Sequence, residues 1–183
     1  MAACGGQGVE TDPVDQALPA EEQVASDAPA LNQAAIEMRD EILAITQRDS
    51  LRSFTRLAES TPGFSSNFSQ VSHSEHWSLL RRLGVDPLRN IEGLFASPYA
   101  GRQVGDEYWY IWPDFAAYDT GTLVPERLSF QDRKRLLDLI GQDGMEAVRI
   151  RGVYPGVRTA ISDTGRWVYY VHDIGESETE ENE

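Results

Sequence analysis

The side chains best suited to chemistry in this sequence lie in one short run, Ser72-His73-Ser74-Glu75-His76. Two histidines three residues apart share one face of a helix and offer two nitrogens to a metal, with His172 as a candidate third ligand. The same run fits a capping box, in which a Ser and the Glu three residues later satisfy the first backbone N–H groups of a helix. Since that role already explains the Glu, we assign no metal, cofactor or catalytic residue and keep as weak metal candidates only His73, His76 and His172.

A second candidate group consists of arginines near the C-terminus. Arg149 and Arg151 are two residues apart in a segment predicted to be a strand, so they share one face. Arg158 and Arg166 lie at the ends of the two strands predicted next, and the four guanidinium groups could converge on a carboxylate or phosphate. The alternative is a solvated face with cross-strand ion pairs to acids such as Asp163.

A third candidate group is aromatic. The run from Tyr108 to Trp112 ends at Pro113 and predicts a strand that carries Tyr108, Tyr110 and Trp112 on one face. These rings either belong to the core or line a cleft or partner surface, because Tyr and Trp combine a large area with a hydrogen-bonding tip. Trp112 is expected nearer the core and Tyr108 nearer an open rim. The candidate ligand-binding residues are therefore Tyr108, Tyr110, Trp112, Arg149 and Arg151.

Several common catalytic signatures are absent. The sequence contains no G-x-x-x-x-G-K-S/T loop, no G-x-G-x-x-G, no G-x-S-x-G, no H-E-x-x-H and no C-x-x-C. Nucleotide-binding, hydrolase and zinc motifs are thus missing in their sharp forms.

The only cysteine is Cys4, within Met1-Ala2-Ala3-Cys4-Gly5-Gly6, so no intramolecular disulfide supports the fold. Small residues before a cysteine and a polar stretch after it resemble the end of a bacterial lipoprotein signal. The resemblance implies lipidation of Cys4, a periplasmic location and anchorage to a bacterial membrane. It departs from the pattern because no apolar run precedes Ala2, and Met1 stands where the rest of such a signal would be. The alternative is a cytosolic protein with an incidental cysteine.

The elements that must position these residues follow from periodicity. Apolar residues at spacings of four and three, from Leu31 to Ile45, predict a helix, and further helices follow at plausible caps. The predicted helices cover 31–48, 51–60, 73–83, 87–95 and 130–140, the last ending at Gly141. The predicted strands cover 108–112, 147–151, 157–162 and 166–172, with 163–165 as the hairpin loop between the last two.

Strict alternation in the last predicted strand places Trp167, Tyr169 and Val171 on one face and Val168, Tyr170 and His172 on the other. The order of elements predicts one α+β domain over 31–172, whose helical N-terminal half packs on a curved antiparallel sheet. This arrangement resembles the cone-shaped fold of nuclear transport factor relatives. That resemblance implies an open pocket between sheet and helices and implies no activity.

The net charge of −14 argues against nucleic acid as a partner, because phosphate backbones bind basic surfaces. Residues 1–30 hold six acids and no base, and residues 173–183 hold six more and no base. The remaining eighteen acids face all sixteen bases, so the body from 31 to 172 carries only −2. We expect 1–30 to be a disordered acidic tether and 173–183 a disordered acidic tail.

Three hypotheses follow. The first is a non-enzymatic, lipid-anchored periplasmic domain that binds an envelope protein or a small ligand and meets the membrane only through its anchor. The second is a hydrolase or lyase that uses His73, Glu75 and His76 in a pocket. The third is a structural envelope protein that acts by oligomerisation.

Overall fold

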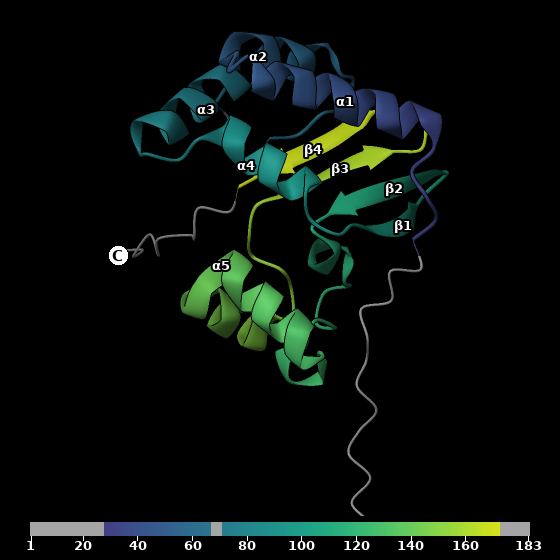
Figure 1. The fold of residues 1–183 in the computed structure, drawn as a ribbon, viewed down its shortest axis with the longest axis vertical. Helices are drawn as coiled ribbons and strands as arrows, with labels where there is room; N and C mark the ends of the chain where they lie inside the picture. The colour runs from purple at the N-terminus through teal and green to yellow at the C-terminus, as the bar shows by residue number, and fades with distance from the viewer. Residues whose placement is uncertain (1–27, 67–70, 173–183) are drawn as a thin grey trace, which may run out of the picture.

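The computed structural model describes residues 28–66 and 71–172, and Figure 1 shows how their elements are arranged. Within these residues, five α-helices and one four-stranded sheet form a single α+β domain, as predicted. Helices dominate the N-terminal half and three of the four strands follow them in the order expected. Cys4, most of the predicted tether and the whole predicted tail over 173–183 lie outside the described residues.

The four N-terminal helices begin where the sequence supplies a capping side chain. They are α1 (Gln33–Gln47), α2 (Leu51–Ser60), α3 (His73–Arg82) and α4 (Pro87–Phe95). In each case the side-chain oxygen of the residue before the helix accepts a hydrogen bond from a backbone N–H of the first turn. These capping residues are Asn32, Ser50, Ser72 and Asp86. The predicted capping box is confirmed, since Glu75 also accepts the backbone N–H of Ser72.

The sheet is a meander of antiparallel neighbours in the order β1, β2, β3, β4. Its strands are β1 (Ala100–Val104), β2 (Glu107–Trp112), β3 (Arg158–Ser162) and β4 (Trp167–Val171). The hairpin between β3 and β4 turns at Gly165, whose φ of 79° is the positive angle predicted for it. Strand β1 was not predicted, because Ala-Gly-Arg-Gln-Val has little β propensity of its own and gains its conformation by pairing with β2.

The predicted strand at 147–151 is wrong, because this segment is the last part of α5 (Phe130–Arg151). Met145 and Val148 are three residues apart and both buried, which is helical spacing, and Gly152 ends the helix with a φ of 64°. The helical part that begins at Phe130 is interrupted at Gly141, as predicted, because the φ of 67° there is non-helical, and a second helical part continues to Arg151. Arg149 and Arg151 therefore do not share a strand face, since residues two apart on a helix point about 200° apart.

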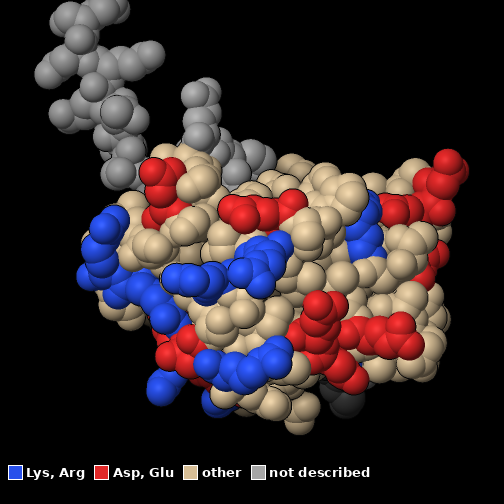
Figure 2. Space-filling view, turned by 90° about the horizontal axis from the view of Figure 1, so that it is seen from above, with Lys and Arg blue, Asp and Glu red and all other residues tan. Residues whose placement is uncertain are grey.

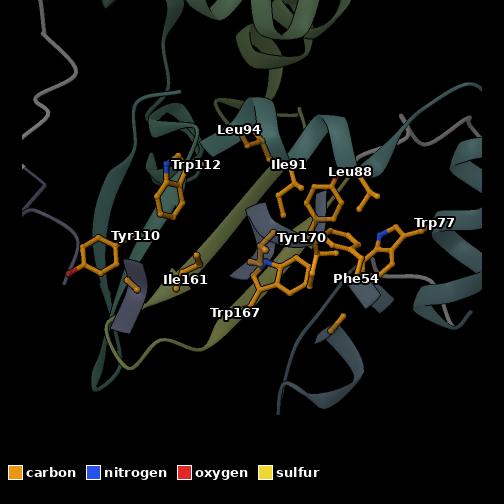
Figure 3. Close-up of a cluster of buried hydrophobic side chains, with 14 of the residues drawn as sticks. Phe54, Trp77, Leu88, Ile91, Leu94, Tyr110, Trp112, Ile161, Trp167 and Tyr170 are labelled. Atoms are coloured by element: carbon orange, nitrogen blue, oxygen red, sulfur yellow. The ribbon is translucent and has the colours of Figure 1, made fainter. Parts of the chain in front are cut away.

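Helices α1 to α4 cover one face of the sheet, and the main core lies between them. Figure 3 shows its aromatic centre, in which the ring of Phe54 on α2 lies 4.6 Å from Trp77 on α3 and 5.0 Å from Trp167 on β4. Tyr170 is also buried here, and its hydroxyl donates to the carbonyl of Pro87 at 2.9 Å. This bond links β4 to the first residue of α4.

A β-bulge in β4 sets which side chains reach that core. Ala160 pairs with Tyr169 whereas the next residue, Ile161, pairs with Trp167, so Val168 is the extra residue. Trp167 and Tyr170 consequently face the same core. The predicted strict alternation put these two rings on opposite faces. It is wrong because the extra residue of the bulge shifts the alternation of side chains by one position.

The opposite face of the sheet is covered by the long connection between β2 and β3. This connection contains the 3₁₀ turns η1 (Asp114–Ala117) and η2 (Pro125–Arg127) and then α5. In Figure 1, α5 lies on the other side of the sheet from α1 to α4. It has its own core of Phe115, Leu123, Leu128, Leu136, Met145, Val148 and Tyr154.

The two edges of the sheet differ. At β4, Ser65 donates its backbone N–H to Val168 at 3.1 Å and accepts the N–H of Tyr170 at 2.9 Å, forming a short parallel bridge. At the other edge, β1 pairs only with β2 among the described strands.

Candidate functional site

A hollow of about 190 Å³ lies where the end of α5 meets the loop before η2. We call it the α5 hollow, and it is lined by Gly121, by residues 123–126 and by residues 148–152. Two glycines hold its base together, since the N–H groups of Gly121 and Leu123 both donate to the carbonyl of Gly152, at 3.1 and 3.2 Å. A Cβ on Gly152 would lie 2.4 Å from the Cα of Gly121, so this approach requires glycine.

Both C-terminal arginines of the candidate set line the α5 hollow, although they reach it from a helix rather than a strand. Arg149 is held in place, because it donates to Glu126 at 2.9 Å and to Glu146 at 3.2 Å. The hydrogen bond from Arg149 lowers the pKa of the Glu126 carboxyl. Arg151 is exposed, and between the two arginines Ile150 leaves 75% of its surface in solvent.

The other two arginines of the predicted set lie elsewhere. Arg166 donates to both oxygens of Glu107 at the start of β2, and this hydrogen bonding lowers the pKa of the Glu107 carboxyl. Ion pairs to acids such as Asp163 were the alternative expected for these arginines, and Arg166 pairs with Glu107. Arg158 donates to the carbonyl of Gly156 at 3.2 Å. The four guanidinium groups therefore do not converge on one anion site.

The aromatic candidates face the helices rather than solvent. Trp112 and Tyr110 are 1% and 4% exposed and belong to the main core, while Tyr108 is half-buried and packs against it. Trp112 meets Phe95 edge to face at 5.0 Å, and the hydroxyl of Tyr110 accepts the N–H of Asn32 at 3.3 Å. The order of burial follows the expectation, and only Tyr108 keeps surface that a ligand could touch.

The three histidines of the chain gather where α3 begins and β4 ends. Burial lowers the pKa of His76, and the neighbouring His172 and His73 lower it further. The hydroxyl of Ser66 lies 2.5 Å from Nδ1 of His73. In the part of the chain that the structure describes, no three His, Cys, Asp or Glu side chains are arranged to hold a metal.

Glu75, the acid of the same run, is committed to the helix cap. Its carboxylate accepts the hydroxyl of Ser72 at 2.8 Å, and this bond lowers the pKa of Glu75. A hydrolase using this corner would depend on the hydrogen-bonded Ser66 and His73 instead. Because Ser66 is buried, a substrate has no direct access to its hydroxyl, which disfavours the hydrolase alternative.

A larger hollow, of about 410 Å³, lies between α2 and the start of α3 and was not predicted. We call it the α2 hollow, and it is lined by Leu51, Arg52, Thr55, Arg56, Glu59 and Ser74, so no histidine lines either hollow. Figure 2 looks down on this helical layer and shows blue Lys and Arg side chains gathered over the left half of the view, with acids among them and toward the right. The available signal was the spacing of Arg52 and Arg56, which are four residues apart and so share one face of α2.

The fold and these hollows define a single α+β domain with a helical layer on one face of its sheet and a helical projection on the other. No protein-family model, curated protein or solved structure matches the chain. Among the described helices, none has both the length and the apolar character needed to cross a bilayer.

Proposed function

We propose that this protein is a non-enzymatic envelope domain, anchored to a bacterial membrane through lipidated Cys4, that binds a protein partner through the end of α5. The Ala2-Ala3-Cys4 motif and the acidic segment after it support the anchor and the tether. The net charge of −14 supports a protein rather than a nucleic acid as partner.

The observation that carries the binding role is the last turn of α5. Ile150 is 75% exposed and stands between Arg149 and Arg151 at the rim of the α5 hollow. An exposed aliphatic side chain flanked by arginines has the composition of an interface centre, where Arg is enriched. The hollow of about 190 Å³ is smaller than the roughly 300 Å³ at which small-molecule pockets begin. A protein surface therefore fits this site better than a small ligand.

Photo-crosslinking in the native bacterium tests the binding role. A photoreactive residue at position 150 should give one discrete adduct, and the same residue at Asp106, an exposed turn position, should give none. Changing Arg151 to Glu should reduce the adduct about tenfold, which corresponds to about 1.4 kcal/mol of binding free energy. Equal labelling from both positions would contradict the proposal, and an adduct of twice the chain mass would favour the oligomeric alternative.

The anchor is tested separately. Mass spectrometry of the protein from membranes should find acyl chains on Cys4, and an unmodified Cys4 would contradict the anchor without affecting the crosslinking result.

A further inference from the structure

The α2 hollow contains basic charge that is not neutralised within the described chain. Arg52 and Arg56 are exposed, lie one turn apart and form no ion pair with residues 28–66 or 71–172. Other arginines of the same helical layer do pair, since Arg39 meets Asp40 and Arg81 meets Asp49. The two arginines of the hollow thus present positive charge to whatever enters it.

The rest of the hollow suits carboxylates. Two hydroxyl-bearing residues belong to its lining, namely Thr55, which is 8% exposed, and Ser74 in the first turn of α3. The N-terminal end of a helix carries partial positive charge, which adds to that of the arginines. Glu59 is the single acid in the lining, so two bases face one acid.

The chain itself contains a matching acidic segment, residues 173–183. It has six acids and no base, namely Asp173, Glu176, Glu178, Glu180, Glu181 and Glu183. The segment begins directly after His172, which is close enough to His76 on α3 to lower the pKa of that imidazole. Ser74 of the hollow lies two residues before His76 on the same helix. Eleven residues can span up to about 36 Å, so the segment can extend far along the helical layer from this starting point.

The other acidic segment, at the N-terminus, starts from the wrong end of the helical layer. It joins α1 at Asn32, whose side chain donates to the carbonyl of Asp163 in the β3–β4 hairpin. The fifteen residues of α1, about 22 Å of helix, separate that point from the beginning of α2. The two segments hold the same number of acids, so the starting position and the closer spacing of the acids in 173–183 favour the C-terminal segment.

We infer that the acidic segment 173–183 docks in the α2 hollow and that its carboxylates pair with Arg52 and Arg56. The contact covers two exposed arginines of the helical layer, so the folded chain presents less positive charge to other anions than its described residues alone would. Because the α5 hollow plays no part in it, this inference stands apart from the proposed function.

Paramagnetic relaxation in the full-length chain tests the inference. A spin label on Cys introduced at Ser177, in a Cys4→Ser background, should broaden the amide signals of α2 to less than half their intensity at low salt. The effect should fall at least twofold in Arg52→Gln/Arg56→Gln and at about 0.5 M salt, where the Debye length is only a few ångströms. The matched control is Arg127→Gln, an exposed arginine on η2, which should leave the broadening unchanged.

A second label separates the two acidic segments. With the spin label on the native Cys4, α2 should keep its full signal intensity. Broadening from Cys4 but not from position 177 would assign the hollow to the N-terminal segment and overturn the inference. Broadening from position 177 that is the same in the double arginine variant and in Arg127→Gln would also overturn it, because proximity without charge pairing would then explain the effect.

Discussion

Arg135 on α5 clamps Asp114 with two parallel hydrogen bonds, of 2.7 and 2.8 Å, at the point where the chain leaves β2. Asp114 is 4% exposed, and the guanidinium also lies 4.3 Å from the centre of the Phe115 ring. Asp132 accepts a third bond from the same guanidinium, at 2.8 Å. This relationship ties α5 to the end of β2 through an ion pair whose carboxylate is buried and whose guanidinium is partly exposed.

Removing the cation should leave Asp114 buried without its partner. We expect Arg135→Met to lower the free energy of unfolding by about 3 kcal/mol, since an uncompensated buried charge is costly. Urea denaturation measures this loss. The matched control is Lys134→Met, whose ion pair with Asp138 is exposed on both sides and should change stability by less than about 0.5 kcal/mol. Equal effects of the two variants would show that the clamp does not hold α5.

Truncating the aromatic side chains of β2 should destabilise the domain by amounts that follow their burial. Trp112 is 1% exposed, so Trp112→Ala should destabilise the domain by about 3 to 5 kcal/mol. Tyr108 is half-buried, and Tyr108→Ala should cost about 1 to 2 kcal/mol because less apolar surface is lost. Equilibrium denaturation of both variants checks the order, and a larger loss at Tyr108 would contradict the burial described for this strand.

The base of the α5 hollow should not tolerate a side chain at Gly152. Gly152 and Gly105 have φ values of 64° and 60°, so an alanine at either position meets the cost of a left-handed conformation, about 1 to 2 kcal/mol. At Gly152 the added Cβ also meets Gly121, whereas nothing lies within 4 Å at Gly105. Gly152→Ala should therefore lower the thermal midpoint more than Gly105→Ala does. Equal midpoints would mean that the loop can move away from α5.

His76 should make stability depend on pH. Burial and two neighbouring imidazoles hold the pKa of His76 below its ordinary value of about 6.5, so the unfolded chain takes up the proton first. The stability that depends on neutral His76 is fully present above about pH 6.5 and declines as the pH falls below that value. Between about pH 7.5 and about pH 5.5, the wild type should lose more stability than His76→Met, measured by urea unfolding at each pH. Parallel losses would exclude this imidazole as the source.

Local signals in the sequence predicted much of the fold. The capping box at Ser72 and the glycine of the β3–β4 hairpin each impose their conformation on nearby backbone, so a short window contains the relevant information. The segment 147–151 was wrongly predicted as a strand because Val148 and Ile150 alternate with polar residues, as the residues of a strand do. Its true partners, the buried rings and aliphatic groups of the second core, come from distant parts of the chain.

The candidate site was less accessible to sequence reasoning. The bulge at Val168 and the close approach of Gly152 to Gly121 both depend on contacts between segments that are distant in the sequence. No local sequence pattern predicts either of them. The α2 hollow needed α3 to supply Ser74 opposite Arg52 and Arg56. Lipidation of Cys4 and the resemblance to the nuclear transport factor fold stay predictions.

The unequal edges of the sheet limit how copies of this domain can join. Ser65 already uses backbone groups of Val168 and Tyr170, so a neighbouring strand could add in the described domain only along β1. Two copies that met at this edge would form a closed two-fold pair and leave no further strand free to pair. Through the strands of residues 28–66 and 71–172, addition at β1 would thus end at a dimer.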